Sequence, residues 1–166
     1  MCNCNADEIA RSGADAVTCF FLVNEPDAAR VADHRAHLAE ITRICRQIGY
    51  PVIVEALVVD DQGHTVRKTR DILHAARLAA ELGVSVLKID SPLEIADLEV
   101  VVGSVNVLVC IRGGTPRDKE VDTLADVDAY MQAGARGIVY GRSIFQAVDP
   151  AHILSNIHRV VHGGIA

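Results

Sequence analysis

The stretch "VSVLKID", residues 84–90, has the length and composition of a buried β-strand, yet it carries one lysine, Lys88. Four further apolar runs of similar length lie at residues 15–23, 51–59, 105–113 and 136–141. Each run is almost continuously apolar instead of alternating with polar residues, which is typical of parallel strands covered on both faces. The sequence therefore predicts a parallel β-sheet.

Helical patterns separate the predicted strands. Apolar residues recur with helical spacing over residues 27–48 and 66–82, and shorter helices are expected near 5–12, 93–102, 119–133 and 149–161. Gly49, Gly83 and Gly134 follow three of these helices, where a left-handed backbone conformation suits glycine. The succession of βα units shows no linker and predicts one α/β domain over residues 1–166.

Two architectures repeat βα units in this way: an open doubly wound sheet and a (β/α)8 barrel. The chain has no GxGxxG or GxxxxGK[ST] motif, so the dinucleotide and P-loop interpretations lack support. Residues with useful chemistry instead follow the predicted strands at their C-terminal ends: Asn24, Glu55, Lys88, Arg112 to Gly114, and Gly141 with Arg142. In a barrel these ends form the active-site face, which favours the barrel.

The composition narrows the classes of function. The formal net charge of −6 argues against nucleic acid or an anionic membrane as a partner. No apolar run approaches the roughly 20 residues of a membrane span, and the N-terminus lacks the basic and apolar regions of a signal peptide. The five cysteines lack the spacing of a disulfide framework. We therefore expect a cytoplasmic protein with reduced thiols.

Lys88 is the first candidate for chemistry. A buried amine with a lowered pKa attacks carbonyl groups and forms a Schiff base, whose iminium accepts electrons during C–C cleavage. The structural alternative is an ion pair with Glu55 or Asp90, and the sequence alone leaves both open. Glu55 lies on the preceding strand, where its carboxylate would orient the lysine, carry its protons, or simply pair with it.

Two glycine-containing strand ends predict an anion site. "CIRGGTP" contains Arg112, Gly113 and Gly114, while "VYGRSIFQ" contains Gly141 and Arg142 and begins a short helix. Glycines let backbone amides approach a phosphate, and arginine adds positive charge. Ordinary turns are the alternative, but two such loops at consecutive strand ends favour phosphate.

No metal or organic cofactor is expected. His34 and His37 lie three residues apart on a predicted helix, but no carboxylate or cysteine completes a ligand set, so a surface pair is the preferred interpretation.

Five segments together resemble the DhnA-type class I aldolases: "GADAVTCFFLVN", "YPVIVEAL", "AAELGVSVLKID", "VLVCIRGG" and "AGARGIVYGRSIFQAVDP". That group is similar to archaeal-type fructose-bisphosphate aldolases, deoxyribose-phosphate aldolases (DeoC-like) and the autoinducer-2 phosphate thiolase. The resemblance implies a (β/α)8 barrel and a Schiff-base lysine at Lys88. It also implies a phosphate site at Gly113, Gly114, Gly141 and Arg142.

The resemblance also has departures. Family members carry a catalytic aspartate on the first barrel strand, whereas this sequence matches the barrel from its fourth strand to its eighth. Many members carry a tyrosine near the position of Leu57, and Glu55 is the nearest substitute here. Five strands cannot close an eight-stranded barrel, so the expected fold is a partial barrel with two open edges. Such edges predict association into a homo-oligomer or marginal stability.

The resemblance therefore implies a class I aldolase-like lyase that acts on a phosphorylated ketose or related sugar phosphate. Lys88 and Glu55 are its expected catalytic residues. Two alternatives stay open: a non-catalytic, truncated homologue that binds a phosphometabolite, and a thiolase-like acyl transfer that uses the same lysine.

Overall fold

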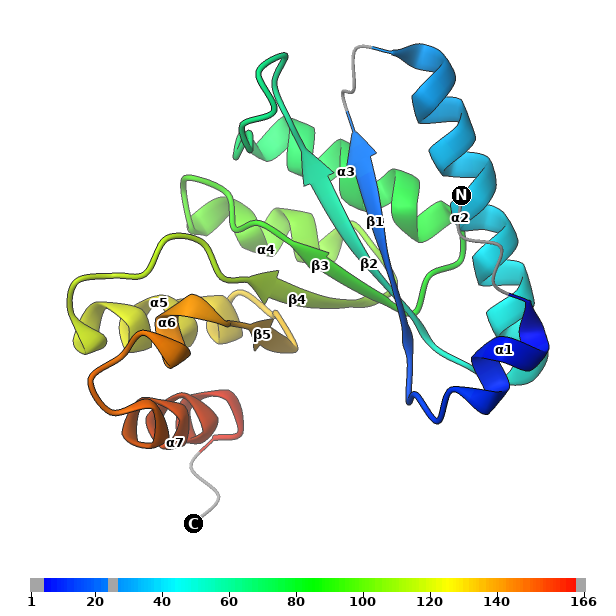
Figure 1. Cartoon of the computed structure of the whole chain (residues 1–166). Coiled ribbons are helices and arrows are strands. Elements are labelled where there is room, and N and C mark those ends of the chain that lie inside the picture. Colours follow the sequence, from blue (N-terminus) through cyan, green and yellow to red (C-terminus); the bar gives the residue numbers. More distant parts are fainter. Residues whose placement is uncertain (1–4, 24–26, 164–166) are drawn as a thin grey trace.

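The computed structural model describes residues 5–23 and 27–163 of the chain. The strands are β1 (Val17–Val23), β2 (Val52–Val58), β3 (Val86–Ile89), β4 (Leu108–Arg112) and β5 (Gly137–Val139). The helices are α1 (Ala6–Arg11), α2 (Ala28–Ile48), α3 (Thr69–Glu81), α4 (Ala96–Gly103), α5 (Glu120–Gln132), α6 (Arg142–Phe145) and α7 (Pro150–Val161). Strands and helices alternate as the sequence predicts, although β5 is shorter than the predicted run (Figure 1).

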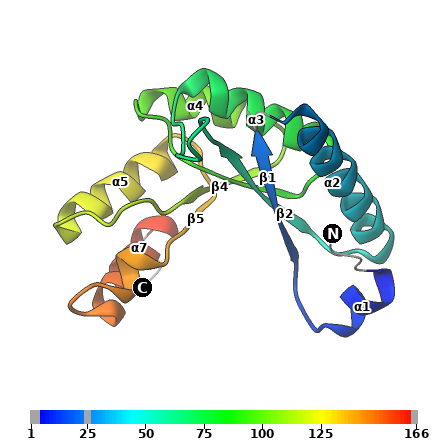
Figure 2. The same ribbon diagram turned by 45° about the horizontal axis from the view of Figure 1, so that its top comes forward.

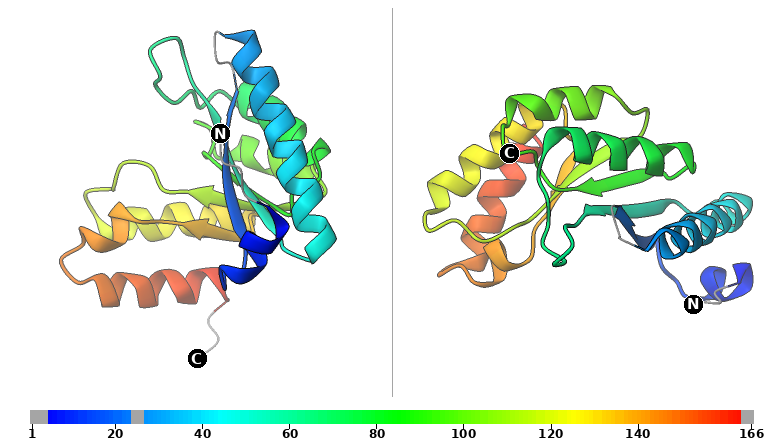
Figure 3. Two further views of the ribbon diagram at one scale, coloured as in Figure 1. Left: turned by 45° about the vertical axis from the view of Figure 1, so that its right-hand side comes forward. Right: turned by 90° about the horizontal axis from the view of Figure 1, so that it is seen from above.

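The five strands form one parallel sheet in the order β1-β2-β3-β4-β5. Helices α2 to α5 follow the convex side of this sheet, so the elements describe an open arc when seen from above (Figures 2 and 3). A doubly wound sheet would reverse its strand order and carry helices on both faces. The sequential order and one-sided helices are those of a partial (β/α)8 barrel, as expected.

The core lies between the convex face of the sheet and the helices. Alternate strand residues point into it, among them Val54 on β2, Leu87 and Ile89 on β3, and Ile111 on β4, all fully buried. On the helices, small and aliphatic side chains face this core, such as the buried Ala76 of α3. Because side chains alternate across a strand, the residues between these core positions point to the concave face.

Local signals set the ends of the helices. The side chain of Asp27 accepts hydrogen bonds from the amides of Ala29 and Arg30 and so caps α2. Gly49 ends the same helix in the left-handed conformation, with φ of 77°, as predicted for its position. Such caps set the residue at which a helix ends, and therefore where the following strand can begin.

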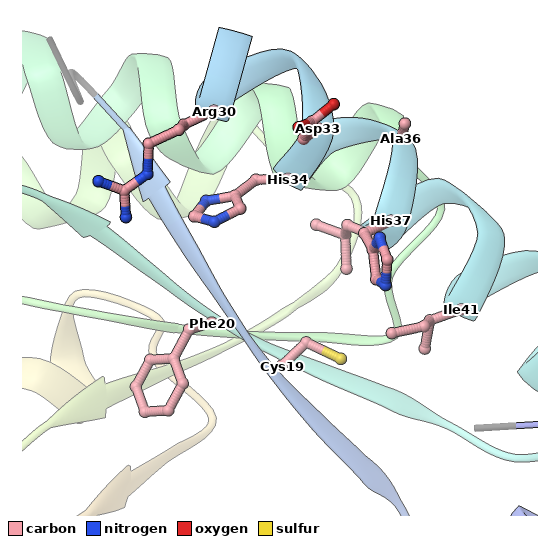
Figure 4. Close-up of a pocket in the computed structure, with 9 residues that line it drawn as sticks. Cys19, Phe20, Arg30, Asp33, His34, Ala36, His37 and Ile41 are labelled. Carbon is pink, nitrogen blue, oxygen red and sulfur yellow. The ribbon is translucent and has the colours of Figure 1, made fainter. Parts of the chain in front are cut away.

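The two outer strands, β1 and β5, are the edges of the sheet. On the concave face, Phe20 of β1 is 67% exposed, and Val139 of β5 is also exposed. A groove of about 590 Å³ runs between β1 and the first half of α2 (Figure 4). The predicted open edges are therefore present, and apolar side chains on the concave face beside them are exposed.

The two histidines of the predicted surface pair lie on α2. His34 and His37 line the groove beside β1, where His34 extends from α2 toward the strand (Figure 4). Within residues 5–23 and 27–163, no group of three or more His, Cys, Asp or Glu side chains is placed to hold a metal ion.

None of the helices in those ranges combines the length and apolarity that a membrane-spanning segment needs.

Candidate active site

Lys88 points to the concave face of the sheet, because its neighbours Leu87 and Ile89 point into the core. The register places Glu55 of β2 directly beside it, and the Lys88 Nζ donates a hydrogen bond to Glu55 Oε2 over 2.6 Å. The side chains are 20% and 8% exposed, respectively. The expected neighbours on consecutive strands are thus in contact, and Glu55 is the direct partner of the ammonium.

Arg112 extends this pair into a cluster of four charges. Its Nε lies 3.5 Å from Glu55 Oε1 and also 3.5 Å from Asp90 Oδ1. Positive and negative groups therefore alternate along Lys88, Glu55, Arg112 and Asp90, and the formal charge of the cluster is zero. Because each charge has an opposite charge beside it, the four ionisable side chains can be mostly buried together.

Burial raises the pKa of Asp90 above its ordinary value, and the charge of Glu55 acts in the same direction. The positive charges of Arg112, Arg67 and Lys88 oppose this rise without cancelling it. From the sequence, Asp90 was predicted only as a possible ion-pair partner of Lys88. Its position two residues after Lys88, and so on the same face of the strand, is the feature that could have predicted its place in the cluster.

The glycine loops lie at the same end of the sheet. The Gly113 amide donates to the Val139 carbonyl over 3.0 Å, so it extends the pairing of β4 with β5. A Cβ on Gly113 would lie 3.0 Å from the Tyr140 ring, which explains the need for glycine there. The Gly114 carbonyl accepts a hydrogen bond from Arg142 Nη2 over 3.1 Å, which links the two loops.

Gly141 directly precedes the short helix α6. Its carbonyl accepts hydrogen bonds from the amides of Ile144 and Phe145, both over 2.9 Å. The amides of Arg142 and Ser143 lie in the first turn, where helical amides have no acceptor within the helix. The Gly113 amide is already hydrogen-bonded. An anion would therefore bind more readily at Gly114, Gly141 and this first turn than at the Gly113 amide.

One cavity of about 340 Å³ brings together the predicted catalytic pair and the residues of both predicted glycine loops. Its lining residues are Glu55, Lys88, Arg112, Gly113, Gly114, Val139, Tyr140, Gly141, Arg142 and Ser143. The carboxylate comes from β2 and the amine from β3, while the glycine loops follow β4 and β5. An amine, a proton acceptor and an anion-binding loop around one space suit the addition of Lys88 to the carbonyl of an anionic substrate.

Some side chains at this end of the sheet were not singled out from the sequence. Tyr140 and Ser143 line the cavity beside the predicted residues, and burial raises the pKa of the Tyr140 hydroxyl. Asn24, expected at the same rim, lies outside the described residues.

Comparisons with known proteins identify the family of the chain. Residues 1–147 match the sequence model of the DeoC/LacD family aldolases. A 2-amino-3,7-dideoxy-D-threo-hept-6-ulosonate synthase of Halobacterium salinarum is 32% identical over 160 residues, which are 94% of this chain and 57% of the relative. The chain spans just over half the length of the curated relatives it matches.

Two solved structures resemble the chain over almost its whole length. An archaeal fructose 1,6-bisphosphate aldolase superposes with a TM-score of 0.89 at 26% identity, covering 99% of this chain and 64% of that one. A structure of an archaeal fructose-1,6-bisphosphate aldolase with its catalytic lysine covalently bound to the carbinolamine intermediate of the substrate gives a TM-score of 0.87 at 26% identity. That match covers 97% of this chain and 63% of the other. On the family match and these likenesses, the chain belongs to the DeoC/LacD family of aldolases.

Proposed function

We propose that this protein is a class I, Schiff-base aldolase-type lyase whose substrate is a phosphorylated ketose or related sugar phosphate. The observation that supports it most strongly is the 2.6 Å contact between Lys88 Nζ and Glu55 Oε2 inside the cavity that the glycine loops also line. An amine with an adjacent proton acceptor is the arrangement that imine formation requires.

The reaction begins with Lys88. Glu55 accepts a proton from the ammonium, and the neutral amine adds to the substrate carbonyl carbon to give a carbinolamine. Protonation of the carbinolamine hydroxyl and loss of water leave an iminium. When a base removes the proton of the substrate hydroxyl, the C–C bond breaks and its electron pair passes to the iminium nitrogen. An aldehyde leaves, and protonation and hydrolysis of the enamine release the second product.

Glu55 is the proposed proton carrier in these steps because its oxygen is already bonded to the reacting nitrogen. The substrate phosphate is proposed to lie against Gly114, Gly141 and the first turn of α6. Arg142 supplies positive charge at the loop, since its guanidinium is anchored to the Gly114 carbonyl. Gly113 and Arg112 line the same cavity as the amine.

Reduction in the presence of substrate tests the proposal. The intact protein is incubated with fructose 1,6-bisphosphate, the substrate of the similar archaeal aldolases, and then treated with sodium borohydride. We expect a stable mass increase in the unaltered protein and none in Lys88→Met. Lys68→Met is the matched control and keeps the adduct. A folded protein that gains no mass with this or other ketose phosphates contradicts the aldolase proposal.

Phosphometabolite binding without catalysis is the second candidate, and the open barrel supports it because the described sheet has only five strands. In that case Lys88→Met would keep its affinity for a sugar phosphate, while Arg142→Ala would lose it, as measured by calorimetry. Transfer of an acyl group to coenzyme A, assayed beside aldol cleavage, distinguishes the thiolase-like alternative.

We also propose that a second copy of the chain covers the open side. Apolar side chains near its two edges are exposed, namely Phe20, Val139 and Phe145, and burying them against another copy removes them from water. Sedimentation velocity should show association that Phe20→Ser weakens and Val100→Ser, on the outer helix α4, does not. A monomer at every concentration contradicts it.

The location of the protein remains a prediction from its thiols. Among the described residues, Cys45 and Cys110 form no disulfide, and thiols of this kind are usual in a reducing, cytoplasmic compartment.

A further inference from the structure

Asp90 is a mostly buried carboxylate that the proposed reaction does not use. It directly follows β3, two residues after Lys88, and is only 9% exposed. It lines a second cavity, of about 380 Å³, which shares Arg112, Gly114, Tyr140 and Ser143 with the cavity of Lys88. The wall between the two cavities therefore includes the arginine that contacts both carboxylates.

Arg112 is shared between these carboxylates. Its Nε is 3.5 Å from an oxygen of Glu55 and 3.5 Å from an oxygen of Asp90, and its Nη1 is 3.5 Å from the other oxygen of Asp90. Charge-assisted hydrogen bonds of arginine to a carboxylate are normally about 2.7–2.9 Å long. The longer distances place the guanidinium between its two partners without a short bond to either.

Arg67 faces the same region but has other partners. Its Nε donates to the Ser91 carbonyl over 2.7 Å and its Nη2 to the Pro92 carbonyl over 3.1 Å. It therefore holds the backbone that follows Asp90. Arg117, which lines the same cavity, is paired with Asp126 over 2.7 Å. Among the described residues, Arg112 is thus the cation within ion-pair distance of the Asp90 carboxylate.

We propose that Asp90 is a positioning residue, which holds Arg112 back from Glu55 and so leaves the Glu55 carboxylate to Lys88. Without the negative charge of Asp90, Arg112 turns fully to Glu55 and competes with the ammonium for it. The cluster then carries one excess positive charge, which favours the neutral form of the amine. The inference deepens the proposed function and rests on it, since Lys88 is the reacting amine there.

The charged groups that face Asp90 are Glu55 from β2, Lys88 from β3, Arg112 from β4 and Arg67 from the segment before α3. Because burial raises the pKa of Asp90, its carboxyl gains a proton at a higher pH than an exposed aspartate does. Protonation has the same consequence as its replacement by asparagine: it releases Arg112 toward Glu55.

The test measures the reactivity of Lys88 without substrate, so it does not depend on aldolase activity. The protein is labelled with trace acetic anhydride over a range of pH, and peptide masses give the extent of acetylation at each lysine. The chain has only two other lysines, Lys68 and Lys119, which serve as internal references. The matched control is Asp61→Asn, which removes an exposed aspartate from the loop after β2.

In Asp90→Asn, the pH of half-maximal labelling at Lys88 should fall by about one unit, which corresponds to a roughly tenfold change in the ratio of ammonium to amine. Asp90→Glu should restore it, and Asp61→Asn should not change it. Arg112→Gln removes the intermediary and should move Lys88 labelling to higher pH, because Glu55 is then no longer shared. In the Arg112→Gln background, Asp90→Asn should produce at most half of its original shift.

Two outcomes overturn the proposal. An equal shift from Asp90→Asn in both backgrounds shows that Asp90 acts on Lys88 directly and not through Arg112. Unchanged labelling in Arg112→Gln also overturns it, and this arm remains decisive if Asp90→Asn fails to fold. Failure of the aldolase proposal is distinguishable, because it appears as absence of a borohydride adduct while Lys88 labelling still responds to Asp90.

Discussion

Replacing Glu55 by leucine tests whether the ion pair with Lys88 exists for stability or for chemistry. Two unit charges 2.6 Å apart attract by about 6 kcal/mol at an effective dielectric constant of about 20, before the cost of their desolvation. Removing one partner of a buried pair typically costs about 3–5 kcal/mol, since the remaining charge is left uncompensated. We expect about 3 kcal/mol for Glu55→Leu, because Lys88 is 20% exposed and gains some hydration.

The double variant Glu55→Leu, Lys88→Met separates the two interpretations. It leaves Arg112 paired with Asp90, so no charge in the cluster is uncompensated. Apolar replacements of a buried pair are often neutral or stabilising. We therefore expect the double variant to lie within about 1 kcal/mol of the unaltered protein, and the single variant to be clearly less stable.

Urea unfolding followed by circular dichroism gives the free energies of unfolding of the parent, both single variants and the double variant. A double variant clearly less stable than the unaltered protein would show that the pair is a net source of stability. The reasoning would then fail, and the structural interpretation of Lys88 would be favoured.

Other predictions concern single positions near the site. Gly113→Ala should lower the free energy of unfolding by about 1–3 kcal/mol in urea, because its Cβ meets the Tyr140 ring, whereas Gly114→Ala has open space and should be nearly neutral. Equal losses at the two glycines would refute this. Gly49→Ala should cost about 1 kcal/mol, because φ is 77° at that residue, and thermal unfolding would detect it. Burial raises the pKa of the Cys110 thiol, so its alkylation by iodoacetamide should still be increasing above pH 9, and a plateau near pH 8 would contradict the burial.

The sequence predicted that Lys88 and Glu55 lie on neighbouring strands for a physical reason. Consecutive βα units place their strands side by side, so charges near the ends of two successive strands come together. The sequence could not choose between Glu55 and Asp90 as the partner, because that choice depends on the register of β2 with β3. Side-chain alternation explains why Asp90 reaches Arg112 on the same face.

The glycine loops show what sequence reasoning could not resolve. Gly113 was expected to offer its amide to an anion, but that amide continues the hydrogen bonding of β4 to β5. Only the position of β5, which spans three residues, reveals this. Similarly, Arg112 was assigned to the phosphate from its place in "CIRGG", whereas its guanidinium lies beside two carboxylates.

The attachment site of the trapped substrate tests the central claim most directly. After borohydride reduction with fructose 1,6-bisphosphate, digestion and peptide mass spectrometry should place the added mass on Lys88 and leave Lys68 and Lys119 unmodified. An adduct on either of those two lysines, with Lys88 unmodified in folded protein, would contradict the assignment of Lys88 as the reacting amine.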